Sequence, residues 1–184
     1  MEEFSLYVLD IVMNSVRAGA ENIDVTLDDR GGMLTFKVTD DGCGMTKDQL
    51  ERLTDPFFTT RKTRGVGLGV PFLKMLAEQT GGDVTVSSVA ASDSPEHHGT
   101  TLVATFNSDH IDFIPMGDIK DTFVTLIQGN PDVNFTFVHL KDGGEVRLSC
   151  AELRSVLGEG IPLSSAEVLA WIRDYLAEAY QEIK

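Results

Sequence analysis

The chain has 184 residues with a formal net charge of −14, and 42% of its residues are hydrophobic. This length suits one generous domain, or one domain with a small appendage, and it allows a sizeable core without disulfides. The acidic excess argues against nucleic acid or anionic membranes as partners, since phosphate recognition needs a basic face.

The N-terminus and the cysteines indicate a cytoplasmic protein. Met1-Glu2-Glu3 lacks the basic start and the apolar block of a secretion signal, and no apolar run approaches the ~18 residues of a membrane span. Cys43 and Cys150 are too few for a disulfide framework, which suits a reducing compartment.

Periodicity and turn residues divide the first part of the chain into helices and strands. Gly19 suits the C-terminal cap of the first helix, and Thr46 with Gln49 resembles a capping box at the start of a short helix. A turn over residues 28–32 makes the first two strands a hairpin, and residues 55–67 are predicted as a loop. Helices are predicted over residues 4–17, 46–53 and 68–80, and strands over residues 23–27, 33–39, 83–89 and 101–106.

The rest of the chain is predicted to form a smaller α/β module. The last helix, which Ser164-Ser165 caps, carries an apolar stripe. We expect this stripe to pack on the module's own hairpin or to dock onto a protein partner. The other elements are helices over residues 118–128 and 151–157 and a hairpin of strands 133–140 and 145–148.

Together these elements predict an α+β protein whose main unit is a two-layer α/β sandwich, with helices on one face of a mixed, mostly antiparallel sheet. We assign residues 1–109 to this domain and residues 110–184 to the C-terminal module. No motif in the module has a chemistry that we can assign.

Three of the polar side chains in the first predicted helix form a group. Asp10, Asn14 and Arg17 are spaced four and three residues apart, so they share one helix face. A ligand with phosphates and a divalent cation would suit them, because an Asn carbonyl can bind Mg²⁺ and an arginine can pair with phosphate. A solvent-facing stripe on an amphipathic helix is the alternative.

A carboxylate and two glycines follow the second predicted strand. Asp40 can accept a hydrogen bond from an exocyclic amine such as that of adenine, and Gly42 and Gly44 would let a flat ring lie against bare backbone. A turn that binds no ligand is the alternative for this stretch.

A basic and glycine-rich segment comes next. Residues 56–77 contain no Asp or Glu in an otherwise acidic chain. Glycines just before the helix predicted at 68–80 would free backbone N–H groups to bind an anion. We expect a polyanion to bind here, the alternative being a chance gap. The basic residues are Arg61, Lys62, Arg64 and Lys74, and the glycines are Gly65, Gly67 and Gly69.

The order of these motifs resembles that of the GHKL superfamily, whose shared ATP-binding unit is the Bergerat fold. Its members include DNA gyrase, the heat-shock chaperones of the ninety-kilodalton class, histidine kinases and mismatch-repair ATPases. The resemblance covers about residues 4–107, and residues 56–70 are nearest to the histidine kinases. The matching boxes are Asn14, Asp40-Asp41-Gly42-Cys43-Gly44-Met45, the aromatic box Phe57-Phe58-Thr59-Thr60, residues 65–69, and Gly99-Thr100-Thr101.

The resemblance implies roles for single residues. Asn14 would coordinate Mg²⁺, Arg17 would contact phosphate, and Asp40 would hold the adenine amine. Thr101 would reach adenine through a water molecule, and Asp10 stands where hydrolytic members carry the Glu that activates water. Further nucleotide contacts are expected from Gly42, Gly44, Met45, Phe58, Thr60, Arg61, Lys62, Gly65, Val66, Gly67, Leu68 and Gly69.

Two departures from the family bear on activity. Asp10 is one methylene shorter than Glu, and a general base must come within about 3 Å of its proton or act through one water, so fast hydrolysis is not expected. None of the four histidines opens an upstream helix as a phosphoacceptor would.

We therefore expect a stand-alone domain that binds Mg²⁺-ATP and either hydrolyses it slowly or passes the γ-phosphoryl group to a separate protein, with Asp10 and Arg17 as catalytic side chains. The alternative is an anti-sigma-like or partner-docking module that binds nucleotide without turnover. A degenerate member of the family without a ligand is the third interpretation.

Overall fold

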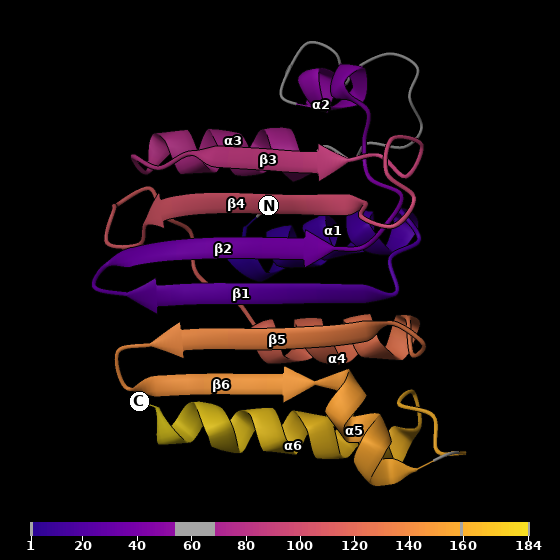
Figure 1. The fold of residues 1–184 in the computed structure, drawn as a ribbon. Coiled ribbons are helices and arrows are strands. Elements are labelled where there is room, and N and C mark those ends of the chain that lie inside the picture. Colours follow the sequence, from indigo (N-terminus) through magenta and orange to yellow (C-terminus); the bar gives the residue numbers. More distant parts are fainter. Residues whose placement is uncertain (1, 54–68, 159, 184) are drawn as a thin grey trace.

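The chain folds around a six-stranded sheet (Figure 1). The structure is a computed structural model and describes residues 2–53, 69–158 and 160–183. The strands are β1 (Asn22–Arg30), β2 (Met33–Asp40), β3 (Val84–Val89), β4 (Gly99–Asn107), β5 (Asn134–Lys141) and β6 (Gly144–Ser149). The helices are α1 (Phe4–Arg17), α2 (Lys47–Leu53), α3 (Gly69–Gln79), α4 (Ile119–Gly129), α5 (Cys150–Leu157) and α6 (Ala166–Glu182).

The strands lie in the order β3-β4-β2-β1-β5-β6. Neighbouring strands run antiparallel except for β1 and β5, which are parallel and place Ile23 opposite Phe135. The prediction of an α+β fold with a mixed, mostly antiparallel sheet is therefore confirmed.

Alternation along the strands gives the sheet one buried face and one open face. In β2, Phe36 and Val38 are buried while Lys37 between them is exposed. Helices α1, α3 and α4 lie on the buried face (Figure 1). The core there is aromatic: the ring of Phe4 meets Phe36 and Phe106 edge-on, with ring centroids 5.6 and 5.2 Å apart. Edge-on pairs of this kind add to the free energy of burial.

Strands from the C-terminal part extend the same sheet. The backbone N–H of Asn134, at the start of β5, donates to the carbonyl of Glu21 just before β1 at 2.8 Å. Helix α4 packs against both α1 and α6. The division of the chain at residue 109 stays a prediction, and the sheet includes strands from both sides of it.

Helix α6 covers the outer edge of β6. The hydroxyl of Tyr175 donates to the carbonyl oxygen of Arg147 in β6 at 2.9 Å, and the apolar stripe of α6 is buried at Val168, Ile172 and Leu176. Covering an edge in this way keeps another chain from pairing with its backbone.

Strand β1 is longer than the sequence predicts. The structure extends it through Arg30, which pairs with Met33, although residues 28–32 are predicted as a turn. The reversal needs only Gly31 and Gly32, whose φ angles of 61° and 75° favour glycine. The hairpin therefore closes more tightly than expected.

The predicted capping box is present at the start of α2. The backbone N–H of Thr46 donates to Gln49 Oε1 at 2.9 Å, and the N–H of Gln49 donates to Thr46 Oγ1 at 3.4 Å. These two bonds satisfy helix-terminal N–H groups that have no partner within the helix.

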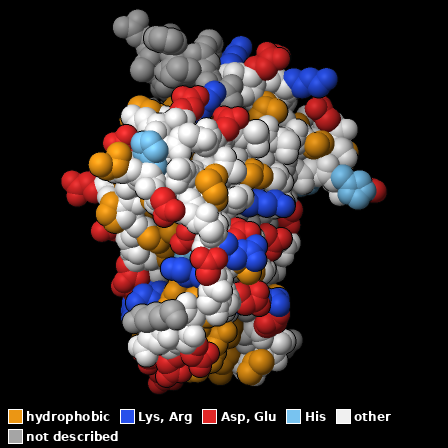
Figure 2. Space-filling view, turned by 90° about the vertical axis from the view of Figure 1, so that its left-hand side faces the viewer, with side chains coloured by type: hydrophobic (Ala, Val, Ile, Leu, Met, Phe, Trp, Pro, Cys, Tyr) orange, Lys and Arg blue, Asp and Glu red, His pale blue; other side chains and the backbone are white. Residues whose placement is uncertain are grey.

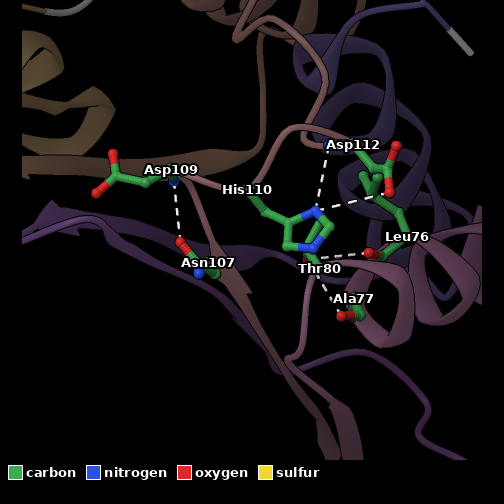
Figure 3. Close-up of polar contacts among 7 residues, drawn as sticks. All are labelled: Leu76, Ala77, Thr80, Asn107, Asp109, His110 and Asp112. Atoms are coloured by element: carbon green, nitrogen blue, oxygen red, sulfur yellow. Dashed lines mark hydrogen bonds and ion pairs between the residues drawn. The ribbon is translucent and has the colours of Figure 1, made fainter.

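A compact turn follows β4 and leads to the C-terminal part (Figure 3). The N–H of Asp109 donates to Asn107 Oδ1 at 3.0 Å, and the N–H of Asp112 donates to His110 Nδ1 at 3.2 Å. Just after α3, the buried hydroxyl of Thr80 donates a hydrogen bond to carbonyl oxygens of that helix. The turn is thus held by local side-chain contacts.

The surface carries charges of both signs. On the face shown in Figure 2, acidic side chains are spread widely, with lysines and arginines between them. Among the described residues, no helix is both long enough and apolar enough to cross a bilayer.

Candidate functional site

Helix α1 carries the three polar residues that the sequence singles out. Arg17 Nη1 donates to Asn14 Oδ1 at 3.0 Å, so the structure brings these two side chains into direct contact. Asp10, one turn earlier, lies with Arg17 on the wall of a cleft of about 830 Å³. Two of the three residues on the predicted helix face, Asp10 and Arg17, therefore line this cleft.

The cleft runs between α1 and α3, and the turn after β4 closes one side of it. Asp112 of that turn and Leu76 of α3 both line it (Figure 3). The rest of the lining is mainly apolar and includes Leu6, Tyr7, Leu9, Met13, Phe72, Met75 and Ile114. Charged groups are thus confined to a few places on an otherwise apolar wall.

Asp10 and Gly69 are packed against each other. A side chain on Gly69 would collide with the carboxylate of Asp10, so glycine is required there unless Asp10 moves. Gly69 is the first described residue of α3. The acidic side chain of Asp10 in α1 is therefore in direct contact with the backbone of α3 at this glycine.

Asp40 is fixed by two hydrogen bonds at the end of β2. The hydroxyl of Ser15 in α1 donates to Asp40 Oδ2 at 2.6 Å, and the N–H of Gly42 donates to Asp40 Oδ1 at 3.0 Å. Ser15 is buried. It is missing from the predicted site because a serine on an apolar helix face has the same sequence signature as a core residue.

A row of polar groups crosses the sheet beside Asp40. Thr100 of β4 pairs with Asp40 on one side and with Ser88 of β3 on the other. The hydroxyls of Ser88 and Thr100 are 2.8 Å apart, and the N–H of Met45 donates to Ser88 Oγ at 2.8 Å. Met45 is thereby joined to the same row as Asp40.

Thr101, the predicted adenine contact in this strand, lies on the other face of the sheet. Its hydroxyl donates to Thr39 Oγ1 at 3.3 Å, whereas Leu102 and Ala104 on the helix side are buried. By alternation, Thr100 shares the helix side with those two residues. The apolar residues that follow in the strand therefore indicate from the sequence which of the two threonines faces the helices.

Two positions in the loop after Asp40 have no room for a side chain. A side chain on Gly42 would meet Ala18, and one on Gly44, whose φ is 64°, would collide with the backbone of Val89. His98 Nδ1 lies 2.6 Å from the carbonyl oxygen of Gly42. Close neighbours alone account for both glycines, namely Ala18 at Gly42 and the backbone of Val89 at Gly44.

Part of the predicted site falls outside the described residues. Gly69 is the first residue of the basic, glycine-rich segment whose surroundings the structure describes. The predicted positions that lie outside are Phe58, Thr60, Arg61, Lys62, Gly65, Val66, Gly67 and Leu68.

Known proteins resemble part of this chain in sequence. An uncharacterized sensor-like histidine kinase of Rhizobium meliloti is 35% identical over 115 residues, which are 58% of this chain and 20% of that protein. Sensor histidine kinase ZraS of Escherichia coli O157:H7 is 37% identical over 84 residues, 45% of this chain and 18% of its own. The chain thus spans about a fifth of the length of these relatives.

Solved structures resemble it in fold. The MutL ATPase domain of Aquifex aeolicus, in complex with ADP, matches with a TM-score of 0.55 and 14% identity over 95% of this chain and 88% of that one. The N-terminal domain of a DNA repair protein matches with a TM-score of 0.53 and 19% identity over 87% and 58% of the two chains.

The family described as histidine kinase-, DNA gyrase B- and HSP90-like ATPases matches residues 2–110, the part that holds α1, Asp40 and the start of α3. The chain belongs to this family of ATP-binding domains, and its sequence relatives are of the histidine-kinase type.

Proposed function

We propose that the site binds ATP together with Mg²⁺ and either hydrolyses the nucleotide slowly or passes its γ-phosphoryl group to a separate protein. The observation that carries the proposal is the fixed carboxylate of Asp40, held between Ser15 and Gly42 at the end of β2. A carboxylate oriented in this way offers a preformed acceptor for the exocyclic amine of adenine.

The hydrogen-bond inventory supports adenine at Asp40. Each of its two carboxylate oxygens accepts one bond from the protein, and each oxygen has a further lone pair. Thr100, which pairs with Asp40 in the sheet, adds a hydroxyl on the same face. We propose Thr100, in place of Thr101, as the hydroxyl that faces the base.

Asn14 and Arg17 suit the phosphates and the metal. Asn14 Oδ1 accepts from a cation in the structure, namely the guanidinium of Arg17, and oxygen ligands of this kind also bind Mg²⁺. The metal at that oxygen would free Arg17 to pair with a phosphate. When bound, Mg²⁺ would neutralise charge on the phosphates during transfer.

Asp10 is the proposed base for the attacking group. Its carboxylate lies at the start of α3 and on the wall of the cleft, so an attacking water or a partner's side chain could approach it from the cleft. Its short side chain limits its reach, which favours slow hydrolysis over fast turnover.

A protein partner and a cytoplasmic location remain proposals that follow from the sequence. Trp171 in the C-terminal part is 52% exposed, and its ring stacks on Tyr175 with an interplanar angle of 7°. Exposed aromatic side chains are common anchors at protein interfaces.

Calorimetry and a turnover assay test the proposed function. We expect the wild-type chain to bind ATP more tightly with Mg²⁺ than with EDTA, and to form ADP slowly or only with a phosphoacceptor protein present. Asp40→Asn should weaken ATP binding about tenfold to hundredfold, as expected for a lost hydrogen bond to a charged group. Asp24→Asn, on an exposed residue of β1, is the matched control.

The outcomes separate the alternatives. No heat with millimolar ATP and Mg²⁺ on folded wild-type protein would refute nucleotide binding. Tight ATP binding with no ADP formed, alone or with lysate proteins, would favour the module without turnover.

A further inference from the structure

We propose that Asp41, Asn22, Asn134 and Arg154 form a polar relay through which the C-terminal part of the chain positions the loop after Asp40, residues 41–45. Asp41 is the positioning residue at the loop, and Arg154 in α5 is the other end. The proposal rests on ATP binding beside Asp40, and it gives a role to two residues outside the family match at 2–110.

The relay is a continuous series of side-chain hydrogen bonds. Arg154 Nη1 donates to Asn134 Oδ1, Asn134 Nδ2 donates to Asn22 Oδ1 at 3.1 Å, and Asn22 Nδ2 donates to Asp41 Oδ2 at 2.6 Å. Its members come from α5, from the starts of β5 and β1, and from the residue after β2. The pairing of β5 with β1 places the two asparagines opposite each other.

The chemistry of the two ends fixes the direction of the relay. A guanidinium can only donate, and a carboxylate can only accept. With Arg154 at one end and Asp41 at the other, each amide must turn its oxygen toward Arg154 and its NH₂ toward Asp41. The series ties α5 and the starts of β5 and β1 to the residue after β2, so displacement of one member changes where the next can make its bond.

At the Arg154 end, the relay is anchored to backbone as well. Arg154 Nη2 donates to the carbonyl oxygens of Pro131 and Val133 at 2.5 and 3.0 Å. This side chain therefore joins α5 to the segment between α4 and β5. Movement of α5, for example on contact with a partner, would change the hydrogen bonds of Arg154 and so displace the next members of the relay.

At the Asp41 end, the relay reaches the site itself. Asp41 Oδ1 accepts from the backbone N–H groups of Glu21 and Asn22 at 2.8 and 2.9 Å. Burial alone would raise the pKa of Asp41, but the hydrogen bonds from Asn22 and Glu21 outweigh burial and lower the pKa below its usual value. Asp41 lies between Asp40 and Gly42 in the chain. The N–H of Gly42 donates to Asp40, so the orientation of Asp41 fixes the position of the peptide group that holds the proposed adenine acceptor.

Three variants and one control test the relay in the full chain. Arg154→Met removes the donor end. Asn134→Asp keeps an acceptor for Arg154 and removes the donor to Asn22. Asp41→Asn replaces the acceptor end by an amide, which puts an NH₂ group in the place of one carboxylate oxygen. Arg147→Met is the control, because Arg147 also contacts α5, through Glu152, and is not a member of the relay.

Calorimetric titration with Mg²⁺-ATP is the readout, with the thermal midpoint of each variant measured without nucleotide. We expect each relay variant to bind ATP about fivefold more weakly, the size of one net hydrogen bond, and the control to stay within about twofold of wild type. The double variant of Asp41→Asn and Arg154→Met should lose much less than the product of the two single effects, because both break one path.

The result that would overturn the relay is an unchanged ATP dissociation constant in Arg154→Met and Asn134→Asp, whatever their thermal midpoints. Independent, multiplicative effects in the double variant would also overturn it. Failure of the wild-type chain to bind ATP would refute the proposed function instead, so the two failures are distinguishable.

Discussion

The carboxylate of Asp10 lies directly against Gly69, the first residue of α3, so that a methyl group at position 69 would collide with it. The obstructing atoms are at the end of a side chain rather than in the backbone. The contact thus couples the identity of residue 69 to the position of the proposed base.

Gly69→Ala should therefore change catalysis more than stability. The new methyl would force Asp10 into another rotamer, while alanine is favoured over glycine within helices by up to about 1 kcal/mol. We expect the free energy of unfolding to change by less than about 1 kcal/mol, and the rate of ADP formation, or of phosphoryl transfer, to fall severalfold. Gly129→Ala is the control, since a Cβ at this glycine of α4 would meet no atom of the described part of the chain within 4 Å. Unchanged turnover in folded Gly69→Ala would contradict a role for Asp10 as base.

Ser15→Ala should weaken nucleotide binding without touching the ligand. The substitution removes one of the two donors that orient Asp40, and a buried hydrogen bond of this kind contributes about 1 to 2 kcal/mol. Calorimetry should show ATP binding about tenfold weaker. Ser155→Ala, which removes an exposed hydroxyl bonded to a carbonyl within α5, should leave affinity unchanged. Equal affinities in the two variants would show that Asp40 does not need Ser15.

Thr100→Val and Thr101→Val distinguish two assignments of the adenine-side hydroxyl. Valine keeps the shape of threonine and loses the hydroxyl. Thr100 pairs with Asp40 on the helix side of the sheet, whereas Thr101 bonds to Thr39 on the open side. We expect only Thr100→Val to weaken ATP binding, by about fivefold. The opposite ranking would restore Thr101, which the family resemblance favours.

These two threonines also show how far the sequence alone can reach. Helix α1 follows from apolar spacing and the start of α2 follows from Thr46 and Gln49, because both signals are local. The order of the motifs also predicts the ATP-binding family. Which of two adjacent threonines faces the helices depends on the register of β4, and the alternation of its buried residues decides it.

Other features depend on contacts between distant parts of the chain. The parallel pairing of Ile23 with Phe135 joins residues far apart in sequence, and no local pattern in either strand specifies its neighbour. The same holds for Ser15, whose partner Asp40 is 25 residues away. Such residues can be identified as site residues only from the structure, in which the sheet brings their elements together.

His139 makes the stability of the chain depend on pH. It is buried in β5, and its Nδ1 lies 2.7 Å from the hydroxyl of Tyr180. Its Nε2 is also buried and has no hydrogen-bond partner among the described residues. Burial, with a smaller effect from the charge of Lys141, lowers the pKa of His139 from 6.5 to about 4. Between pH 6.5 and 4, His139 therefore binds a proton in the unfolded state but stays neutral in the folded state. The free energy of unfolding falls as the pH drops through this range.

Unfolding in denaturant at several pH values measures this effect. The loss attributable to His139 should reach about 3 kcal/mol near pH 4, at about 1.4 kcal/mol for each pKa unit. His139→Phe should flatten the fall between pH 6.5 and 4, because the unfolded chain then has no imidazole at this position to protonate. Tyr180→Phe should keep the fall, since desolvation of the ring, rather than the hydroxyl, is the main cause of the shift. An equally steep fall in His139→Phe would assign the pH dependence to the carboxylates instead.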